Sequence, residues 1–411
     1  MKSRRYPPGF FDIPQDISAT LPVDIIAEWN HGAQTEEAAR AILSKTLVRG
    51  TIVSSDSSGL TRLSGEMGLI EILAVINKPK ELIYAHGTAN GGEGVGIWAA
   101  DNTQMFYPES IPAEKIVEML AYLRSDLEES CGIKLGIGAH FGSFYSLGGG
   151  LYGPEADAIE EITENHLSGG QVLLSHSFCA RLPKSHSFEI TAVEEGLEHL
   201  GTSHYLHTKK VDASYQLGSH QYPIPYSQPF YEGLHAYQKS KDANLLADLY
   251  ASYTETKCVV LVEREREASG AAELLLLNEL ALTAATKKLL APLIAAHEGE
   301  EIKTAGNITI AVFDSAARAV TFSLLARTAL REVDIESRTG IDTGPVLLFD
   351  IRDGIRDIAG MPVNVASKLA QDKGDSGKIY ASASVARETT LEQFTERTFQ
   401  VSGVEITAYE G

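Results

Sequence analysis

The chain has 411 residues, of which 44% are hydrophobic and 22% charged, as is typical of a soluble globular protein with two or three domains. The formal net charge of −20 argues against nucleic-acid backbones and anionic membranes as partners. The start, "MKSRRYPPGFFDIPQD", lacks the apolar core of a signal peptide, and no run approaches the roughly eighteen apolar residues of a membrane span. We therefore expect a cytoplasmic protein.

Taken in chain order, the sequence predicts an N-terminal extension, two similar domains and a connector. Residues 1–44 form the extension, with a helix near "EEAARAIL". In residues 45–208 an apolar strand, "GTIVSSD", precedes helical stretches such as "AEKIVEMLAYLRSDLEE", in which apolar residues recur every three or four positions. Residues 209–254 contain the Pro- and Tyr-rich "YQLGSHQYPIPYSQPFYEG" and a helix, and are predicted to be a connector. Residues 255–411 form the second domain.

Two segments far apart in the chain share one frame. "LYGPEADAIEEIT" at 151–163 and "IAGMPVNVASKLA" at 358–370 both have a glycine, a following proline and the first turns of a helix. An offset of 207 residues aligns Gly153 with Gly360. The same offset aligns the acidic Asp157 with Asn364. The backbone pattern is therefore repeated while the charge is reversed.

Other segments repeat in the same order. Asp56 aligns with Glu263 at an offset of 207, and Asp101 with Asn307 at an offset of 206. The strand-like "KLGIGAHFG" matches "ESRTGIDTG" at an offset of 202. Several ordered matches at nearly one spacing indicate an internal duplication. Each copy reads β-α-β-β-α-β, which predicts an α+β protein of two ferredoxin-like domains, each with helices on one face of a sheet.

Two segments of the first copy resemble the metal-binding segments of the class III nucleotidyl cyclases. In that family, apolar residues are followed by Asp, two residues, Gly, an apolar or aromatic residue and Thr, and "IVSSDSSGLT" fits this form at Asp56. "IWAAD" fits the second segment at Asp101. The resemblance implies that both carboxylates hold two Mg²⁺ or Mn²⁺ ions. The N–H groups that follow would bind the triphosphate of the substrate, and they belong to Ser57, Ser58, Gly59, Leu60 and Thr61.

The second copy carries the remaining family residues. "KTAGN" fits at Lys303, and "DIAGMPVNVASK" fits from Asp357 through Asn364, with Lys368 where the family has arginine. The resemblance implies that Lys303 donates to an adenine ring nitrogen and that Asp357 accepts from the exocyclic amine. Asn364 would orient the ribose. Lys368, on the same helical face, would stabilise the negative charge on the phosphorus. Because lysine lacks the planar fork of arginine, we expect a reduced rate of reaction.

Each copy lacks what the other holds. The second copy has the uncharged Asn307 at a metal position, where charge neutralisation needs a carboxylate. The positions of the first copy that match the base-reading and phosphate-facing residues hold Ile97, Gly150, Asp157 and Glu161. The resemblance therefore implies an intramolecular pseudo-twofold heterodimer, active as a monomer, with one competent site and one degenerate site between the domains.

The expected function is adenylate cyclisation of ATP to 3′,5′-cyclic AMP and pyrophosphate. One alternative is a catalytically silent nucleotide-binding regulator on the same fold. It is motivated by Lys368 and by Ser143, which stands where relatives often have a basic residue facing the polyphosphate. A second alternative is a cyclase for another nucleotide such as GTP, against which the pairing of Lys303 with Asp357 argues.

Overall fold

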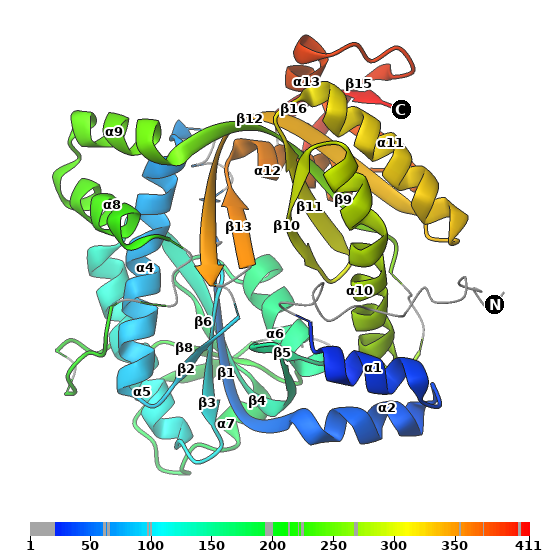
Figure 1. Ribbon diagram of the computed structural model, residues 1–411. Helices are drawn as coiled ribbons and strands as arrows, with labels where there is room; N and C mark the ends of the chain where they lie inside the picture. Colours follow the sequence, from blue (N-terminus) through cyan, green and yellow to red (C-terminus); the bar gives the residue numbers. More distant parts are fainter. Residues whose placement is uncertain are drawn as a thin grey trace. The chain divides into compact units, whose positions relative to one another are not determined.

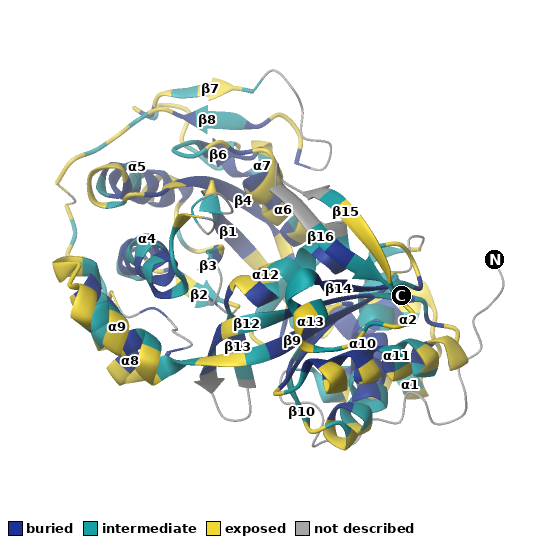
Figure 2. Cartoon of the chain, turned by 90° about the horizontal axis from the view of Figure 1, so that it is seen from above, coloured by how far each residue is buried: buried dark blue, intermediate teal, exposed yellow. Residues whose placement is uncertain are grey.

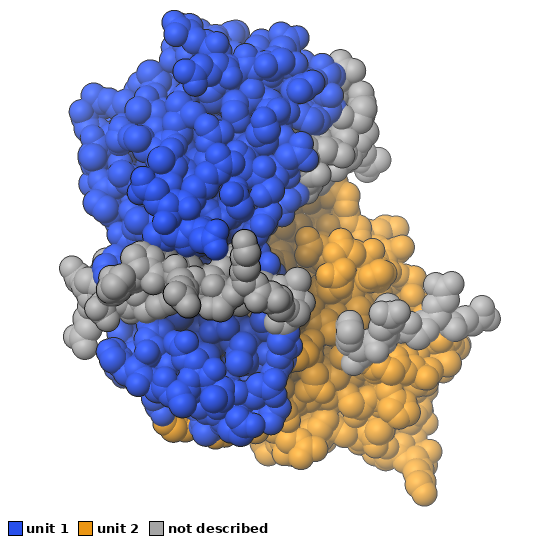
Figure 3. Space-filling view, turned by 90° about the vertical axis from the view of Figure 1, so that its right-hand side faces the viewer, with its two compact units in different colours: residues 1–42, 247–411 blue, residues 43–246 orange. Residues whose placement is uncertain are grey.

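The computed structural model of the chain forms two compact units (Figures 1 and 3). Unit 2 is Leu43–Leu246, and unit 1 is Ala247–Gly411 together with the described part of Met1–Ile42. None of the described helices is both long enough and apolar enough to cross a membrane. The structure describes residues 21–60, 63, 66–96, 98, 101–193, 200–212, 214–220, 222, 226–266, 270–352, 355–372, 374–401 and 404–411.

Unit 2 is built on an eight-stranded sheet with strand order β2-β3-β1-β4-β6-β8-β7, and β5 pairs with β4 outside that path. Helix α8 follows the sheet, and α9 begins in unit 2 and ends in the part of the chain that belongs to unit 1. In chain order the elements are η2 (Ser44–Thr46), β1 (Leu47–Ser58), α4 (Leu69–Ala89), β2 (Glu93–Val95), β3 (Thr103–Pro108), α5 (Ala113–Ser130), β4 (Lys134–Leu147), β5 (Gly150–Tyr152), α6 (Pro154–Asn165), β6 (Val172–Leu174), α7 (His176–Cys179), β7 (Ile190–Ala192), β8 (His204–Leu206), α8 (Gln228–Ser240) and α9 (Ala243–Tyr253).

Unit 1 has a second eight-stranded sheet, of order β10-β11-β9-β12-β14-β16-β15, with β13 pairing to β12. It also includes two helices from the start of the chain. In chain order the elements are α1 (Val23–His31), α2 (Glu36–Leu43), β9 (Thr254–Arg264), α10 (Ala272–Ala296), β10 (Gly299–Ala305), β11 (Ile308–Phe313), α11 (Ala316–Glu332), β12 (Ser337–Arg352), β13 (Ile355–Ala359), α12 (Met361–Ser367), η3 (Lys368–Asp372), β14 (Ile379–Ser382), α13 (Ala383–Glu388), β15 (Thr395–Val401) and β16 (Val404–Glu410).

The two sheets have the same topology, strand for strand. β1 pairs antiparallel with β3 and β4, and β4 pairs parallel with β6. β9 pairs antiparallel with β11 and β12 in the same way, and β12 pairs parallel with β14. The predicted architecture of two repeated α+β domains is confirmed.

Both faces of each central strand are used. In β9, Val260 and Val262 lie in a core with residues of α10 and α11, whereas Val259 and Leu261 lie in a second core with residues of α12. Successive side chains of a strand point to opposite faces, so a run of apolar residues needs cover on both sides. The two long helices therefore share one face, as expected, but the short helix α12 covers the other. The central strands are dark blue in Figure 2 because they are buried.

The N-terminal helices pack on the second copy. The helix predicted near "EEAARAIL" is α2, Glu36–Leu43. Trp29 of α1 is almost fully buried, and its Nε1 donates to Asn278 Oδ1 of α10 at 3.1 Å. Arg40 of α2 lies 3.9 Å from the carboxylate of Glu273, also on α10. These contacts make the described part of the extension an additional layer on α10.

Unit 1 also buries the carboxylate of Asp342 in β12, and the cost of burying this charge can be measured. Asp342 accepts a hydrogen bond from Ser382 Oγ, and burial raises its pKa from 3.8 to about 6. Because the pKa is higher in the folded state than in the unfolded chain, folding is penalised as pH rises from about 4 through 6. Asp342→Asn should therefore raise the free energy of unfolding above pH 6 by up to about 3 kcal/mol, and should change it little below pH 4.

Urea unfolding of both proteins between pH 4 and 8 measures this difference. Asp314→Asn is a matched control, because the exposed carboxylate of Asp314 pairs with Lys257 and has its pKa lowered by that contact. Removing Asp314 should leave stability unchanged or lower it at pH 8. An Asp342→Asn protein that is less stable than the wild type at pH 8 would contradict the raised pKa of Asp342.

Candidate functional site

Two predicted metal ligands lie together at the end of the first strand of unit 2. Asp56 lies near the end of β1, and Asp101 lies just before β3. Asp101 Oδ2 accepts a hydrogen bond of 2.5 Å from Ser57 Oγ. Ser55 Oγ lies 2.7 Å from Thr103 Oγ1. These two contacts fasten the segment that carries Asp101 to β1.

The two carboxylates repel each other. Burial, followed by the negative charges of Asp101 and Glu164, raises the pKa of Asp56 from 3.8 to about 7. A divalent cation would offset this repulsion, and Mg²⁺ commonly binds one or two carboxylates together with substrate phosphates. Within the described ranges, no group of three or more His, Cys, Asp or Glu side chains could hold a metal ion. The residues present therefore fit a cation shared with a substrate rather than a closed structural site.

The backbone after Asp56 makes a sharp turn. β1 continues through Ser58, and Gly59 then adopts φ = +84°. A Cβ at Gly59 would meet nothing within 4 Å, so the glycine is needed for its backbone conformation rather than for close packing. Leu60 begins a helical turn in which Leu63 N donates to Gly59 O at 3.2 Å. Thr61, also predicted to bind the triphosphate, lies outside the described residues.

The matching position of unit 1 is already neutralised by the protein. Glu263 Oε2 accepts from Arg338 Nε at 2.6 Å, and Glu263 Oε1 accepts from Asn307 Nδ2 at 3.1 Å. Asn307 Oδ1 accepts in turn from the Arg266 guanidinium at 3.0 Å. Glu263 and Asn307 are both buried. An arginine here supplies the positive charge that a metal ion would supply at Asp56.

Strand register explains this difference. Asp56 lies directly opposite Gly136 in β4, whereas Glu263 lies directly opposite Arg338 in β12. Opposed residues of antiparallel strands share a face, with Cβ atoms about 5 Å apart. A Cβ at Gly136 would lie 2.7 Å from Leu167 Cβ, so unit 2 cannot place a side chain there without moving its neighbours. The offset of 202 residues already aligns Gly136 with Arg338, but only the register shows that both face the carboxylate positions.

The predicted base-reading residues lie side by side in unit 1. Lys303 of β10 donates to Asp357 Oδ2 of β13 at 3.3 Å. Asp357 Oδ1 accepts from the Ile358 backbone N–H at 2.9 Å, which holds the carboxylate in place. The Asp357 side chain is 8% exposed and that of Lys303 is 38% exposed. A fixed acceptor thus lies beside a more accessible donor.

Of the other two predicted residues, Asn364 lies on α12, and Lys368 directly follows that helix as the first residue of η3. Helix α12 follows Gly360, which has a φ of +148°. A Cβ added to this residue would lie 2.8 Å from Pro345 O, so both the backbone conformation and the close approach require glycine. Pro362 lies in the first turn of α12, as the sequence predicts. Asn364 is exposed, and Lys368 is half-buried at the start of the π-helical segment η3. Since they are four residues apart, Asn364 and Lys368 lie on one side of the helix.

Unit 2 repeats this frame without its chemistry. Gly153, with φ of +119°, precedes α6 as Gly360 precedes α12. Asp157 and Glu161 of α6 are both exposed, so this helix presents negative charge where α12 presents an amide and the adjoining η3 begins with an ammonium. Gly150 lies in β5, and Ile97 lies outside the described residues. The charge reversal seen in the sequence is therefore carried by two equivalent helices.

Ser143 is exposed on β4, where the family resemblance implies a basic residue in many relatives. Its backbone N–H donates to Glu155 Oε2 at 2.8 Å. The contact with His140, whose Nε2 lies 3.5 Å from Glu155 Oε1, lowers the pKa of Glu155. The local group beside Ser143 is thus a carboxylate, which offers nothing to a polyphosphate.

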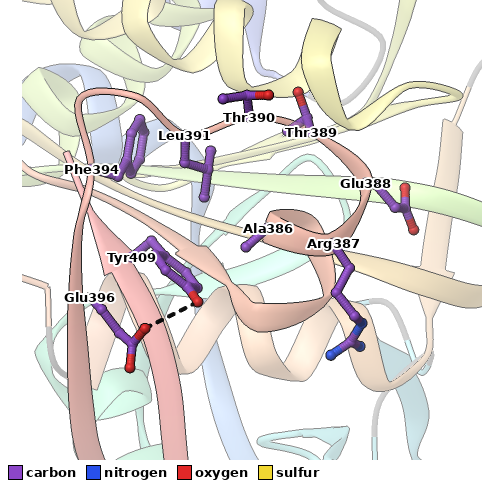
Figure 4. Close-up of a pocket in the computed structure, with 9 residues that line it drawn as sticks. All are labelled: Ala386, Arg387, Glu388, Thr389, Thr390, Leu391, Phe394, Glu396 and Tyr409. Carbon is purple, nitrogen blue, oxygen red and sulfur yellow. Dashed lines mark hydrogen bonds between the residues drawn. The ribbon is translucent and has the colours of Figure 1, made fainter.

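Two hollows lie elsewhere, and none of the predicted site residues lines either of them. One, on unit 1, has a volume of about 690 Å³, and in its lining Tyr409 Oη of β16 donates to Glu396 Oε2 of the neighbouring strand β15 at 3.3 Å (Figure 4). It is bordered by Ala386, Arg387, Glu388, Thr389, Thr390, Leu391, Phe394, Glu396 and Tyr409. The other, of about 600 Å³, lies in unit 2 between the end of α5, the start of β4 and the turn before β6.

The structure therefore holds two sets of groups, one in each unit. Unit 2 brings together Asp56, Ser57 and Asp101, and the turn at Gly59 follows them. Unit 1 brings Lys303 and Asp357 into contact, and it places Asn364 on α12 and Lys368 at the start of the adjoining η3. The sequence alone did not reveal Arg338 and Arg266, which close the corresponding carboxylate position of unit 1.

Comparison with known proteins identifies the fold. No protein-family model matches the sequence, and neither does any curated protein. A class III adenylyl cyclase-like ATP-binding protein from Pseudomonas aeruginosa aligns over 92% of this chain and 93% of its own, with a TM-score of 0.50 and 9% identity. An adenylate/guanylate cyclase/hydrolase from Silicibacter pomeroyi aligns over 38% of this chain and 96% of its own, with a TM-score of 0.31 and 25% identity. The first likeness shows that this chain has a class III cyclase-like fold; the second has too low a TM-score to define one.

The arginine of unit 1 can be tested directly. Arg338→Ala should lower the free energy of unfolding by about 2 kcal/mol, because Glu263 is left buried with an uncompensated charge. Adding Glu263→Gln to this variant should restore most of the loss, since Gln carries no charge and still accepts from Asn307. Urea unfolding at pH 7 of the wild type, the single variants and the double variant gives the coupling energy. Additive effects of the two changes would exclude the proposed pairing.

Proposed function

We propose that the chain is a class III adenylate cyclase that converts ATP into 3′,5′-cyclic AMP and pyrophosphate. The unequal division of chemical groups between two units of identical topology carries this proposal. Among the described residues, Asp56 and Asp101 lie close enough to repel each other and neither forms an ion pair with a basic side chain, whereas Glu263 is neutralised by Arg338. The complementary groups of unit 1 are an ion-paired donor and acceptor, the amide of Asn364 on α12 and the ammonium of Lys368 at the start of η3.

In this proposal both units contribute to one nucleotide site, and the matching second site is degenerate. Its carboxylate position is occupied by an arginine contact, and its helix, α6, carries Asp157 and Glu161, which would repel phosphate. The chain would act as a cytoplasmic monomer through its two internal domains, with ATP as substrate and without nucleic-acid or membrane partners.

The proposed reaction is an in-line displacement. The ribose 3′-oxygen attacks the α-phosphorus, a new P–O bond forms, and the bond to the oxygen that bridges to the β-phosphate breaks, releasing pyrophosphate. Two Mg²⁺ or Mn²⁺ ions held by Asp56 and Asp101 would acidify the 3′-hydroxyl and neutralise charge on the triphosphate. The backbone N–H groups after Asp56, from Ser57 to Thr61, would bind the phosphates.

The residues of unit 1 position the base and the ribose. Lys303 donates to an adenine ring nitrogen, and Asp357 accepts from the 6-amino group, so the pair selects adenine. The bond from the Ile358 N–H supports this role, because it orients the acceptor before substrate arrives. Asn364 orients the ribose. Lys368 stabilises the negative charge that builds on the α-phosphate, as a point charge without the planar fork of arginine.

A second candidate function is ATP binding without turnover. The Pseudomonas aeruginosa protein, whose likeness extends over 92% of this chain, is described as an ATP-binding protein. Lys368 in place of arginine, and Ser143 with its neighbouring Glu155 carboxylate, also favour this reading. In this case the same residues would hold ATP, and no cyclic nucleotide would form.

Incubating the purified chain with ATP and Mn²⁺, and identifying the product by chromatography, distinguishes the two functions. Asp56→Asn should lower cyclic AMP formation by at least about a thousandfold, because one of two cation-holding carboxylates is lost. Glu263→Gln is the matched control at the repeated position and should retain activity. Binding of ATP without any cyclic AMP from the wild type would favour the silent regulator, and equal turnover by Asp56→Asn would contradict the site assignment.

Base selection can be reversed by changing the donor and the acceptor together. In Lys303→Glu/Asp357→Ser the carboxylate can accept from the N1–H and 2-amino group of guanine, and the hydroxyl can donate to O6. The ratio of kcat/KM for ATP to that for GTP should fall by about a hundredfold, the value of two exchanged hydrogen bonds. Competition between the two nucleotides measures the ratio. An unchanged preference for ATP would remove Lys303 and Asp357 from the base site.

A further inference from the structure

Helix α4 of unit 2 buries three polar side chains that an apolar helix would not be expected to bury. Asn77, Lys80 and Glu81 are each 1% exposed. A buried charge is costly unless hydrogen bonds compensate it. Lys80 Nζ donates to the backbone carbonyl of Trp98 at 2.8 Å. The buried ammonium is therefore committed to a segment outside its own helix.

Hydrogen bonds hold both the backbone and the side chain of Trp98. Its carbonyl accepts from Lys80, and its Nε1 donates to Val95 O at 3.0 Å. The indole stacks on Tyr222, with ring centroids 5.8 Å apart and planes 25° apart. It also meets the ring of Tyr84 edge-on at 5.7 Å. With a side chain that is 1% exposed, Trp98 is an anchor rather than a mobile surface residue.

This anchor lies three residues before Asp101. A span of three residues extends at most about 11 Å, so the position of Trp98 limits where the Asp101 carboxylate can lie. On its other side, Asp101 is held by the hydrogen bond from Ser57 Oγ. The carboxylate is thus set between β1 and the Trp98 anchor.

Tyr222 belongs to the predicted connector, not to the sheet or its covering helices. Its hydroxyl donates to Asn77 Oδ1 at 2.7 Å, and its ring centroid lies 5.6 Å from Lys80 Nζ. Upstream in the connector, Gly218 N donates to Ala85 O of α4 at 2.9 Å. The connector is therefore bound along α4 and forms one wall of the Trp98 anchor.

We propose that Lys80 and Tyr222 are positioning residues for Asp101, and that the connector thereby sets the divalent-cation affinity of unit 2. The inference rests on the proposed function, which assigns Asp101 to cation binding. Groups that orient metal ligands commonly change metal affinity by 10- to 100-fold when removed. Any partner or conformational change that lifts Tyr222 from Trp98 would weaken cation binding without touching a ligand.

The repeat supplies a matched control. Lys287 of α10 lies 207 residues after Lys80, and its Nζ pairs with Glu301 of β10 at 2.8 Å. Lysine is therefore present at both positions, but only Lys80 supports the segment of a predicted metal ligand. Lys287→Met removes an equivalent ammonium from the repeated helix.

Mn²⁺ alone is the probe, and the electron paramagnetic resonance signal of free Mn²⁺ measures its dissociation constant with the full-length chain. Lys80→Met and Tyr222→Ala should each raise this constant about tenfold. Tyr222→Phe, which retains the stacked ring, and Lys287→Met should stay within about twofold of the wild type. In the cyclase assay, the KM for Mn²⁺ should rise in Lys80→Met while kcat at saturating Mn²⁺ changes little.

The outcomes distinguish a failure of the positioning role from a failure of the proposed function. If the wild type shows no Mn²⁺ binding that Asp101→Asn removes, the proposed function fails. If the wild type binds and a folded Lys80→Met binds equally well, the positioning role is wrong while the proposed function stands. Should Lys80→Met not fold, the pair at Tyr222 decides the question: equal affinity of the Ala and Phe variants overturns the inference, and weaker binding by Ala alone supports it.

Discussion

The chemistry of each unit depends on which residue lies opposite the carboxylate at the end of its first strand. In unit 2 that residue is Gly136, which leaves Asp56 beside Asp101 with their repulsion uncompensated by a cross-strand cation. In unit 1 it is Arg338, which pairs with Glu263 at 2.6 Å. The repulsion of two close carboxylates favours a divalent cation, whereas an ion pair removes the need for one.

Duplication with divergence accounts for the remaining differences between the units. The strand order is the same in both sheets, and a glycine with positive φ precedes α6 and α12 alike. On this common backbone, α12 and the adjoining η3 carry Asn364 and Lys368 where α6 carries Asp157 and Glu161. The backbone conformation depends on glycine, proline and the buried apolar residues, so exposed positions on the helices could change charge without altering the fold.

The connector that follows the sheet of unit 2 in the sequence packs along α4. Helix α4 buries polar groups that have hydrogen-bond partners, and Tyr222 and Trp98 provide such partners for Asn77 and Lys80. The same contacts hold Trp98, which lies three residues before Asp101. Stability of the helix face and placement of a predicted metal ligand therefore depend on one set of hydrogen bonds, and a perturbation of the connector affects both.

Local patterns were sufficient to predict the repeat, the α+β class and most helices, because apolar periodicity depends on neighbouring residues. "AEKIVEMLAYLRSDLEE" is α5, which extends one residue further. The family resemblance also predicted the residues of the candidate site, which are Asp56, Asp101, Lys303, Asp357, Asn364 and Lys368. The roles of these residues stay predictions. Only the tertiary structure placed α12 on the opposite face from α10, Arg338 against Glu263, and Lys80 and Tyr222 around Trp98. The hydrogen bonds among them join residues 18 to 145 positions apart in the sequence. They depend on strand register and on how distant segments pack together, which a local sequence pattern does not contain.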